Sequence, residues 1–244
     1  MKKILLKSSA LLLIAIVFCM VSCTKKNDTA PNSKKISYQL KVSGTSAPLS
    51  ASVKHSNLAT MGITTGNITW QSGYANVASI SFEGKNQDNN QNTDDFKEPA
   101  VYKVDLFNTN QFLGNVDIAV GTYHNVDIRI ELKQTPADPA LLLKGTYASA
   151  KGSLPIELSF NEGSDQVEIM AIAKDLSVGV KDSYIAFINF HLDKLMAGIQ
   201  TADLDAATVT NGAILINSNS NAGIYSKIKA NISSFSDADY NYNN

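Results

Sequence analysis

A regular alternation of apolar and polar residues is the feature that most limits the folds open to this chain. In 36–42, 126–132 and 154–160 every second residue is apolar, and polar residues or a proline stand between. Successive side chains of a β-strand point to opposite faces, so each segment predicts a strand with one buried and one wet face. Strands of this kind belong to antiparallel sheets, because strands of a parallel α/β sheet are apolar on both faces.

Further strands are expected between these segments. Ser72-Gly73, between Trp70 and Tyr74, predicts a tight hairpin, and Gly121 stands where another turn is needed. Many short strands at regular spacing predict a mainly β fold: an antiparallel β-sandwich of the transthyretin or immunoglobulin type, with Greek-key connections. The additional strands are expected at 67–71, 75–83, 101–108, 112–118, 141–147, 166–173 and 184–192.

Short helices are expected near the C-terminal end. Residues 192–199 and 201–207 are typical of short helices. Ile224, Ile228 and Ile232 recur at helical spacing and predict a helix that packs on the sheet.

A pair of prolines, Pro136 and Pro139, marks the best candidate boundary in the mature chain. The expected organisation is an N-terminal β-sandwich half over 36–135 and a C-terminal β half with short helices over 136–244. The polar tail 237–244 is expected to fray.

The first 23 residues have the composition of an export signal. Residues 1–7 carry three lysines and no acid, and 10–21 form an apolar run too short to remain a transmembrane helix. The run ends in Met20-Val21-Ser22-Cys23, which resembles the lipobox of bacterial lipoproteins, although Met20 stands where leucine is usual. The resemblance implies a signal peptide over 1–22, acyl chains such as palmitate on Cys23, and a flexible tether over 23–35.

Acylation of Cys23 would leave the mature domain without a cysteine, because Cys19 leaves with the signal peptide. The domain then depends on an apolar core, and disulfide scaffolds and Cys-ligated zinc are excluded. Several acyl chains anchor a protein stably, so a membrane is the expected partner. The alternatives are that Cys23 is the last residue of an ordinary signal peptide or a buried thiol.

Charge and the tether bear on partners and location. Without the signal-peptide lysines the chain has 18 basic and 22 acidic residues, a net charge of −4, which argues against nucleic acid. The tether has no run of acids like the surface-display signals of Bacteroidota lipoproteins, which favours an outer-membrane protein that faces the periplasm. Asp28-Thr29-Ala30 resembles the O-glycosylation sequence of that phylum and implies a glycan on Thr29; a plain solvated tether is the alternative.

A second resemblance covers about thirty residues. Val104-Asp105-Leu106-Phe107, Leu113-Gly114 and Gly121-Thr122-Tyr123 precede the alternating strand that ends at Leu132. This series resembles bacterial lipoprotein families of unknown function that carry a "DLF…LG…GxY" pattern on a transthyretin-like β-sandwich. The resemblance implies a fold and an envelope location but no catalytic residues. Tyr123 itself resembles a ring that closes a sandwich corner.

The acidic and amide-rich segment 85–96 is the best candidate for a metal site. Thr93 replaces the glycine that a calcium loop needs for its sharp turn, and Pro99 stands where the bidentate glutamate belongs. A weak calcium site and a solvated connection both stay open. The ligand positions of such a loop would be filled by Asp88, Asn90, Asn92 and Asp94.

The sequence predicts no enzyme. His55, His124 and His191 are far apart, and none has a second histidine or a carboxylate at ligand spacing, so no histidine-bound metal is expected, and no cofactor. Ser226 and Lys229 match the Ser-x-x-Lys pattern of penicillin-binding enzymes, but its partner motifs are missing, and the pair is typical of a wet helix face. The chain is therefore expected to be non-catalytic.

Trp70 and Tyr74 are the residues expected to stack on a ligand, if they lie at an edge of the sandwich. The alternative is that Trp70 fills the core. The leading hypothesis is a non-catalytic, lipid-anchored cell-envelope protein with a binding or structural β-sandwich.

Two other functions stay open. A glycan-binding accessory lipoprotein of a nutrient-uptake system would expose Trp70 and Tyr74 in one plane. A fimbrial subunit or anchor would exchange a strand with another subunit. Fimbrillin-like proteins, which the chain resembles loosely, commonly mature by cleavage after arginine, and the location of Arg129 inside an alternating strand does not favour that route.

Overall fold

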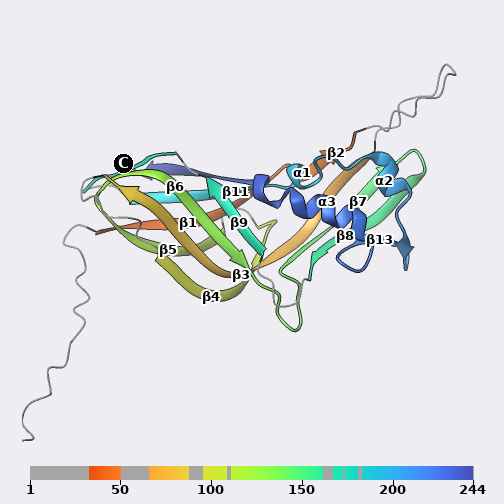
Figure 1. Ribbon diagram of the computed structural model, residues 1–244, viewed down its shortest axis with the longest axis horizontal. Helices are drawn as coiled ribbons and strands as arrows, with labels where there is room; N and C mark the ends of the chain where they lie inside the picture. The colour runs from red at the N-terminus through yellow and green to blue at the C-terminus, as the bar shows by residue number, and fades with distance from the viewer. Residues whose placement is uncertain are drawn as a thin grey trace, which may run out of the picture. The chain divides into compact units, whose positions relative to one another are not determined.

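Strands dominate the structure, a computed structural model that describes residues 33–50, 66–87, 96–108, 111–161, 167–172, 174–180 and 183–243 (Figure 1). The strands form two sheets, and the few short helices lie near the C-terminal end of the chain. All of the described residues belong to one compact unit. The mainly β fold and the late, short helices that the sequence predicts are confirmed.

The smaller sheet has four strands in the order β14-β11-β1-β5. β1 lies between its two neighbours, parallel to β11 and antiparallel to β5, and β14 is antiparallel to β11. The parallel pair departs from the antiparallel expectation, and the long stretch of chain between β1 and β11 supplies the crossover that such a pair needs. The bounds are β1 Ser33–Ser43, β5 Gln111–Ala119, β11 Ser183–His191 and β14 Ser236–Asn243.

The larger sheet has ten strands, seven of them in the order β10-β6-β3-β7-β8-β13-β12. β2 and β4 also pair with β3, and β9 also pairs with β6. β13 is parallel to β8, a second exception to the antiparallel expectation. The bounds are β2 Ser46–Pro48, β3 Asn67–Asn86, β4 Phe96–Asp105, β6 Gly121–Leu132, β7 Leu141–Ser149, β8 Gly152–Phe160, β9 Val167–Ile172, β10 Leu176–Val178, β12 Val209–Thr210 and β13 Ala213–Ile216.

β3 is a single strand of 20 residues, and the predicted hairpin at Ser72-Gly73 is wrong. The ladder between β3 and β7 continues through Gly73 after a register shift between Trp70 and Ser72. A Cβ on Gly73 would lie 2.5 Å from the carbonyl oxygen of Leu142. Glycine is therefore needed here for the close approach of β7, and not to reverse the chain.

One edge of β3 is shared by β7 and β6, which follow one another along it. Between them, Asn76 donates its backbone N–H to the carbonyl of Ala140 and accepts the N–H of Lys133, both at 2.9 Å. The proline-containing connection thus carries the chain from β6 to β7 along the same edge. Strands from both sides of it are interleaved in both sheets, so 36–135 and 136–244 are not separate units.

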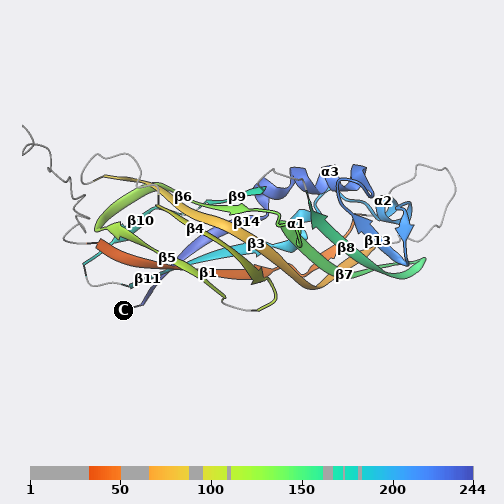
Figure 2. The same cartoon turned by 90° about the horizontal axis from the view of Figure 1, so that it is seen from below.

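The smaller sheet packs against the part of the larger sheet around β3, β6 and β9, while α3 lies beside β7, β8 and β13, and both sheets and the helices contribute side chains to the core (Figure 2). The alternating residues of β1 and β6 point inward as predicted, with Ile36 and Ile128 among the fully buried side chains. The sheets also meet at their margins, where β5 contacts β4 and β14 contacts β9. Ser236 on β14 donates its hydroxyl to the carbonyl of Met170 on β9 at 3.2 Å.

Tyr123 has the corner role that the sequence predicts. Its ring is buried and lies edge-on to Phe82 with the ring centroids 5.7 Å apart, while its hydroxyl donates to the carbonyl of Ala119 at 2.9 Å. The same tripeptide at 145–147 serves another purpose. Tyr147 donates its hydroxyl to Asp205 at 2.7 Å and ties β7 to a helix.

The helices are shorter than predicted but occupy the expected places. Ile224 and Ile228 are buried on α3 as expected, whereas Ile232 begins a 3-10 turn. No helix in the described ranges is long and apolar enough to cross a membrane. The bounds are α1 Leu192–Leu195, α2 Thr201–Asp205, α3 Ala222–Ala230 and the 3-10 turn Ile232–Ser234.

Both ends of the described domain differ from the expectation. β1 begins at Ser33, so the last residues of the expected tether belong to a strand. At the other end, Ser236–Asn243 pairs with β11 along its whole length, and the prediction that this tail frays is wrong. Pairing with β11 supplies the backbone partners that the polar tail alone does not predict.

Candidate functional site

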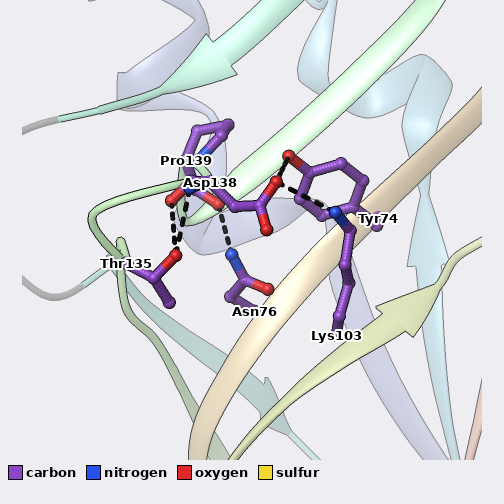
Figure 3. A network of polar contacts seen from close by, with 6 residues as sticks. All are labelled: Tyr74, Asn76, Lys103, Thr135, Asp138 and Pro139. Carbon is purple, nitrogen blue, oxygen red and sulfur yellow. Dashed lines mark hydrogen bonds and ion pairs between the residues drawn. The ribbon is translucent and has the colours of Figure 1, made fainter.

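A polar cluster lies where β3, β4 and the β6–β7 connection meet, and we call Tyr74, Lys103 and Asp138 the Tyr74 cluster (Figure 3). Tyr74 lies on β3 and Lys103 on the neighbouring β4, in register with Asn76. Asp138 belongs to the β6–β7 connection, which passes the edge of β3 opposite to β4. Residues distant in sequence are thus brought together by the pairing of β3 with two neighbours.

One carboxylate oxygen joins the three side chains. Asp138 Oδ1 accepts the Tyr74 hydroxyl at 2.7 Å and the Lys103 ammonium at 2.9 Å. The Lys103 ammonium also lies 3.7 Å from the centroid of the Tyr74 ring, within the range of a cation–π contact. The ring of Tyr74 is therefore partly covered by its own neighbour.

The electrostatics of the cluster do not suit proton transfer. Burial raises the pKa of Tyr74 to about 12, and the hydrogen bond to Asp138 and the charge of that carboxylate add to the effect. The hydrogen bonds from Tyr74 and Lys103 hold the pKa of Asp138 below its ordinary value. Near neutral pH the phenol stays protonated and the carboxylate ionised, whereas a general acid or base needs a pKa near the working pH.

The backbone beneath the cluster is held by the same connection (Figure 3). Asn76 is buried and donates its side-chain amide to the carbonyl of Pro139 at 2.8 Å. Thr135 accepts the N–H of Asp138 on its hydroxyl at 3.0 Å, while its own N–H donates to the carbonyl of Asp138 at 2.9 Å. Asp138 is thereby fixed at its backbone as well as at its side chain.

A shallow pocket of about 450 Å³, which we call the Tyr74 pocket, opens beside the Tyr74 cluster. Most of its lining surface is apolar, although several lining residues carry polar or charged groups, and the side chains of Lys103 and Lys144 are about half exposed. The pocket has the size of a small-ligand site but is open to solvent, so it suits a reversible contact better than an enclosed reaction. Its lining residues are Ser72, Gly73, Tyr74, Lys103, Asp105, Leu142 and Lys144.

Trp70 does not belong to this site. Only 2% of its surface is exposed, and it is among the largest fully buried side chains. The alternative in which Trp70 fills the core is therefore confirmed, and a ligand-stacking role for its ring is excluded in this structure. Tyr74 is partly exposed but does not share an open plane with Trp70.

Several predicted site residues lie outside the described residues. They are the lipid-site Cys23, the O-glycosylation-site Thr29 and the calcium-loop residues Asp88, Asn90, Asn92 and Asp94. The predictions for these positions stay predictions. Within the described ranges, no group of three or more His, Cys, Asp or Glu side chains could hold a metal ion.

The Ser-x-x-Lys pair lies on α3, as expected. Ser226 and Lys229 line one surface pocket, but the Ser226 hydroxyl donates to the carbonyl of Ala222 one turn earlier, at 2.9 Å. That bond is the usual backbone contact of a helical serine.

Arg129 bridges three strands of the larger sheet. It forms ion pairs with Glu83 on β3 at 3.0 Å and with Glu168 on β9 at 2.8 Å, and 30% of its side chain is exposed. An arginine held in this way inside a paired strand is poorly accessible to a protease.

Two histidines form contacts that their positions in the sequence do not indicate. His124 pairs with Asp175, and His191 pairs with Asp237. His191 also contacts Ser43, so a serine, a histidine and an aspartate from three strands form a chain of hydrogen bonds. These residues lie 148 and 46 positions apart, and only the register of the strands could have revealed them.

Comparison of the chain with protein-family models, with curated proteins and with solved structures found no match.

Proposed function

We propose that the protein is a lipid-anchored protein of the cell envelope, whose β-sandwich is held beside a membrane for binding or structural duty. The export signal and the lipobox-like sequence before Cys23 support the anchor. The position of β1 carries the proposal further: it begins at Ser33, ten residues after Cys23. Ten residues reach about 35 Å at most, so the folded domain stays close to the lipid surface.

The anchor is tested with a pair of matched cysteine variants. Cys23→Ala should lose incorporation of a labelled fatty acid and move the protein from the membrane fraction to the soluble fraction. Cys19→Ala is the control and should leave both readouts unchanged, because Cys19 lies in the segment that is removed. A Cys23→Ala protein that still carries the label would disprove the proposal.

We place the protein on the periplasmic side of the outer membrane, because the expected tether lacks a run of acids. Protease treatment of intact cells tests this location. The protein should survive until the outer membrane is opened, and degradation in intact cells would place it on the surface.

The Tyr74 pocket is the best candidate for the binding duty, and we assign it no catalytic step. It is lined by the phenol of Tyr74, the carboxylate of Asp105 and the side chains of Lys103 and Lys144, which offer hydrogen bonds and charge at an open surface. The burial of Trp70 removes the main support for the glycan alternative. The fimbrial alternative is also weakened, because the chain's own β14 continues the smaller sheet beside β11 and Arg129 is tied into paired strands.

A further inference from the structure

Ser43, His191 and Asp237 form a linear chain of hydrogen bonds on the smaller sheet, and we call these three residues the Ser43 cluster. The Ser43 hydroxyl lies 2.8 Å from His191 Nδ1, and His191 Nε2 lies 2.7 Å from Asp237 Oδ2. The second carboxylate oxygen accepts the side-chain amide of Asn189 at 2.8 Å. A nucleophile in contact with a base, and a base in contact with an orienting carboxylate, is the arrangement that activates a serine.

Strand pairing places these side chains, so the geometry rests on rigid elements. Ser43 ends β1 and is the register partner of His191 at the end of β11. Asp237 is the second residue of β14 and the register partner of Asn189, which lies two residues before the histidine. Residues paired in a sheet share a face, which puts the four side chains on the outer face of neighbouring strands.

The carboxylate decides which nitrogen of His191 carries the proton. Burial works against ionisation of Asp237, but hydrogen bonds from Asn189 and His191, with the charges of His191 and Lys194, lower its pKa overall. An ionised carboxylate can only accept, so Nε2 must donate to it. In the neutral ring Nδ1 then has a free lone pair, and this lone pair faces the Ser43 hydroxyl.

The backbone leaves the strand directly after Ser43. Gly44 has a φ of +63°, and a Cβ there would collide with the carboxylate of Asp193. Ser43 is exposed, while 24% of the His191 side chain and 45% of that of Asp237 are accessible. The hydroxyl is therefore open to a molecule from solvent, whereas the base behind it is partly shielded.

We propose that Ser43 is a nucleophile activated by His191, with Asp237 as the positioning residue, and that its substrates are short-chain carboxylic esters. The Ser43 oxygen bonds to the carbonyl carbon, and its proton moves to His191 Nδ1. The bond to the leaving oxygen breaks, and that oxygen takes the proton as the alcohol departs. Water then repeats the sequence on the acyl-serine and releases the acid. A small acyl group fits an open surface because it needs no deep pocket.

This activity goes beyond the proposed function and departs from the sequence-based expectation of a non-catalytic chain. It does not depend on the lipid anchor or on the Tyr74 pocket.

The test is reaction of the full chain, in detergent, with a fluorophosphonate probe. The Ser43 oxygen displaces fluoride from phosphorus, and the proton passes to His191, so peptide mass spectrometry should find the adduct on Ser43. Ser43→Ala should remove the adduct, and His191→Gln should slow labelling about 100-fold or more, the usual contribution of a general base. Ser37→Ala is the matched control: Ser37 lies on the same strand but donates to Asn115, so labelling of Ser43 should be unchanged.

Asp237→Asn provides a second variant if His191→Gln does not fold. An amide in place of the carboxylate can donate to Nε2, which moves the ring proton to Nδ1 and removes the lone pair that faces Ser43. Labelling should fall while the thermal unfolding midpoint stays near that of the wild type. The rate of p-nitrophenyl acetate hydrolysis should rank the variants in the same order as the rate of labelling. An unlabelled Ser43, or labelling that is equally fast in the folded His191 and Asp237 variants, would overturn the proposal.

Discussion

At the scale of single residues, Asp138 ties the β6–β7 connection to side chains of the paired strands β3 and β4. One of its oxygens accepts a phenol from β3 and an ammonium from β4, while its backbone is held within the β6–β7 connection. Only 31% of the Asp138 side chain is exposed, whereas 50% of the Lys103 side chain is exposed. The phenol contact is therefore the better shielded of the two bonds.

Tyr74→Phe should lower the free energy of unfolding at neutral pH, and the deficit should shrink in acid. The pKa of Asp138 is lowered in the folded state, so its contribution is complete above its unfolded pKa of about 4 and is lost as pH falls through the folded value. The phenol bond supplies part of this contribution. Urea unfolding of the wild type and the variant at pH 7 and at about pH 2 measures the change.

Tyr102→Phe is the control for this prediction, because Tyr102 lies on β4 with 42% of its surface exposed. Its unfolding free energy should track that of the wild type at both pH values. If Tyr74→Phe lowers the free energy of unfolding by the same amount in acid and at neutral pH, the stabilising effect of the Tyr74 hydroxyl does not depend on the charge of Asp138.

At the scale of elements, β3 organises the larger sheet. It pairs with β7 and β6 along one edge and with β2 and β4 along the other, and these partners change within a single unbroken strand. A break in β3 would therefore disturb several neighbours together. Gly73 lies on β3 close to the point where its partner changes from β7 to β6, and a Cβ there would lie too close to the backbone of β7.

Gly73→Ala should destabilise the fold by about 1–3 kcal/mol, the usual cost of overpacking. The new methyl would lie 2.5 Å from the carbonyl oxygen of Leu142 and would force β7 away from β3. Gly223→Ala on α3 is the matched control, since a Cβ there meets nothing within 4 Å and alanine favours a helix. The midpoint of thermal unfolding should therefore be lower for Gly73→Ala than for the wild type, and unchanged or higher for Gly223→Ala.

The sequence predicts elements whose signal is local, and it fails where partners decide. The alternation in β1, β6 and β8 follows from one buried face, and these strands are confirmed. A Ser-Gly pair can either reverse the chain or allow a neighbouring strand to approach closely, and the sequence does not distinguish the two. The predicted hairpin is therefore wrong. At the candidate site, the sequence does single out Tyr74, but as a partner of Trp70 in stacking on a ligand. The burial of Trp70 excludes that shared role. The Ser43 cluster depends on register between distant strands, which no local pattern encodes.

At the scale of the whole molecule, the last strand closes the smaller sheet. β14 pairs with β11, contacts β9 of the other sheet, buries Ala238 and supplies Asp237 to the Ser43 cluster. The C-terminal residues thus belong to the cooperative unit, although their composition is that of a loose tail. Hydrogen exchange distinguishes a tail that is part of the folded unit from a loose tail.

The backbone amides of β14 that pair with β11 should exchange as slowly as those of β11 itself. A chain that ends at Phe235 should lose this pairing, expose the edge of β11 and unfold at a lower temperature, with a tendency to associate through the bare edge. Fast exchange across β14, or a truncated chain with an unchanged unfolding temperature, would show that the tail is not part of the folded unit.

The position of β1 in the smaller sheet also has a mechanical consequence. β1 is the first strand after the tether and has hydrogen-bonded neighbours on both sides, β11 and β5. Those bonds lie across the strand direction, so a force along β1 strains many of them at once instead of opening them one after another. A chain anchored at Cys23, as proposed, and pulled by a partner would therefore resist unfolding from its anchored end.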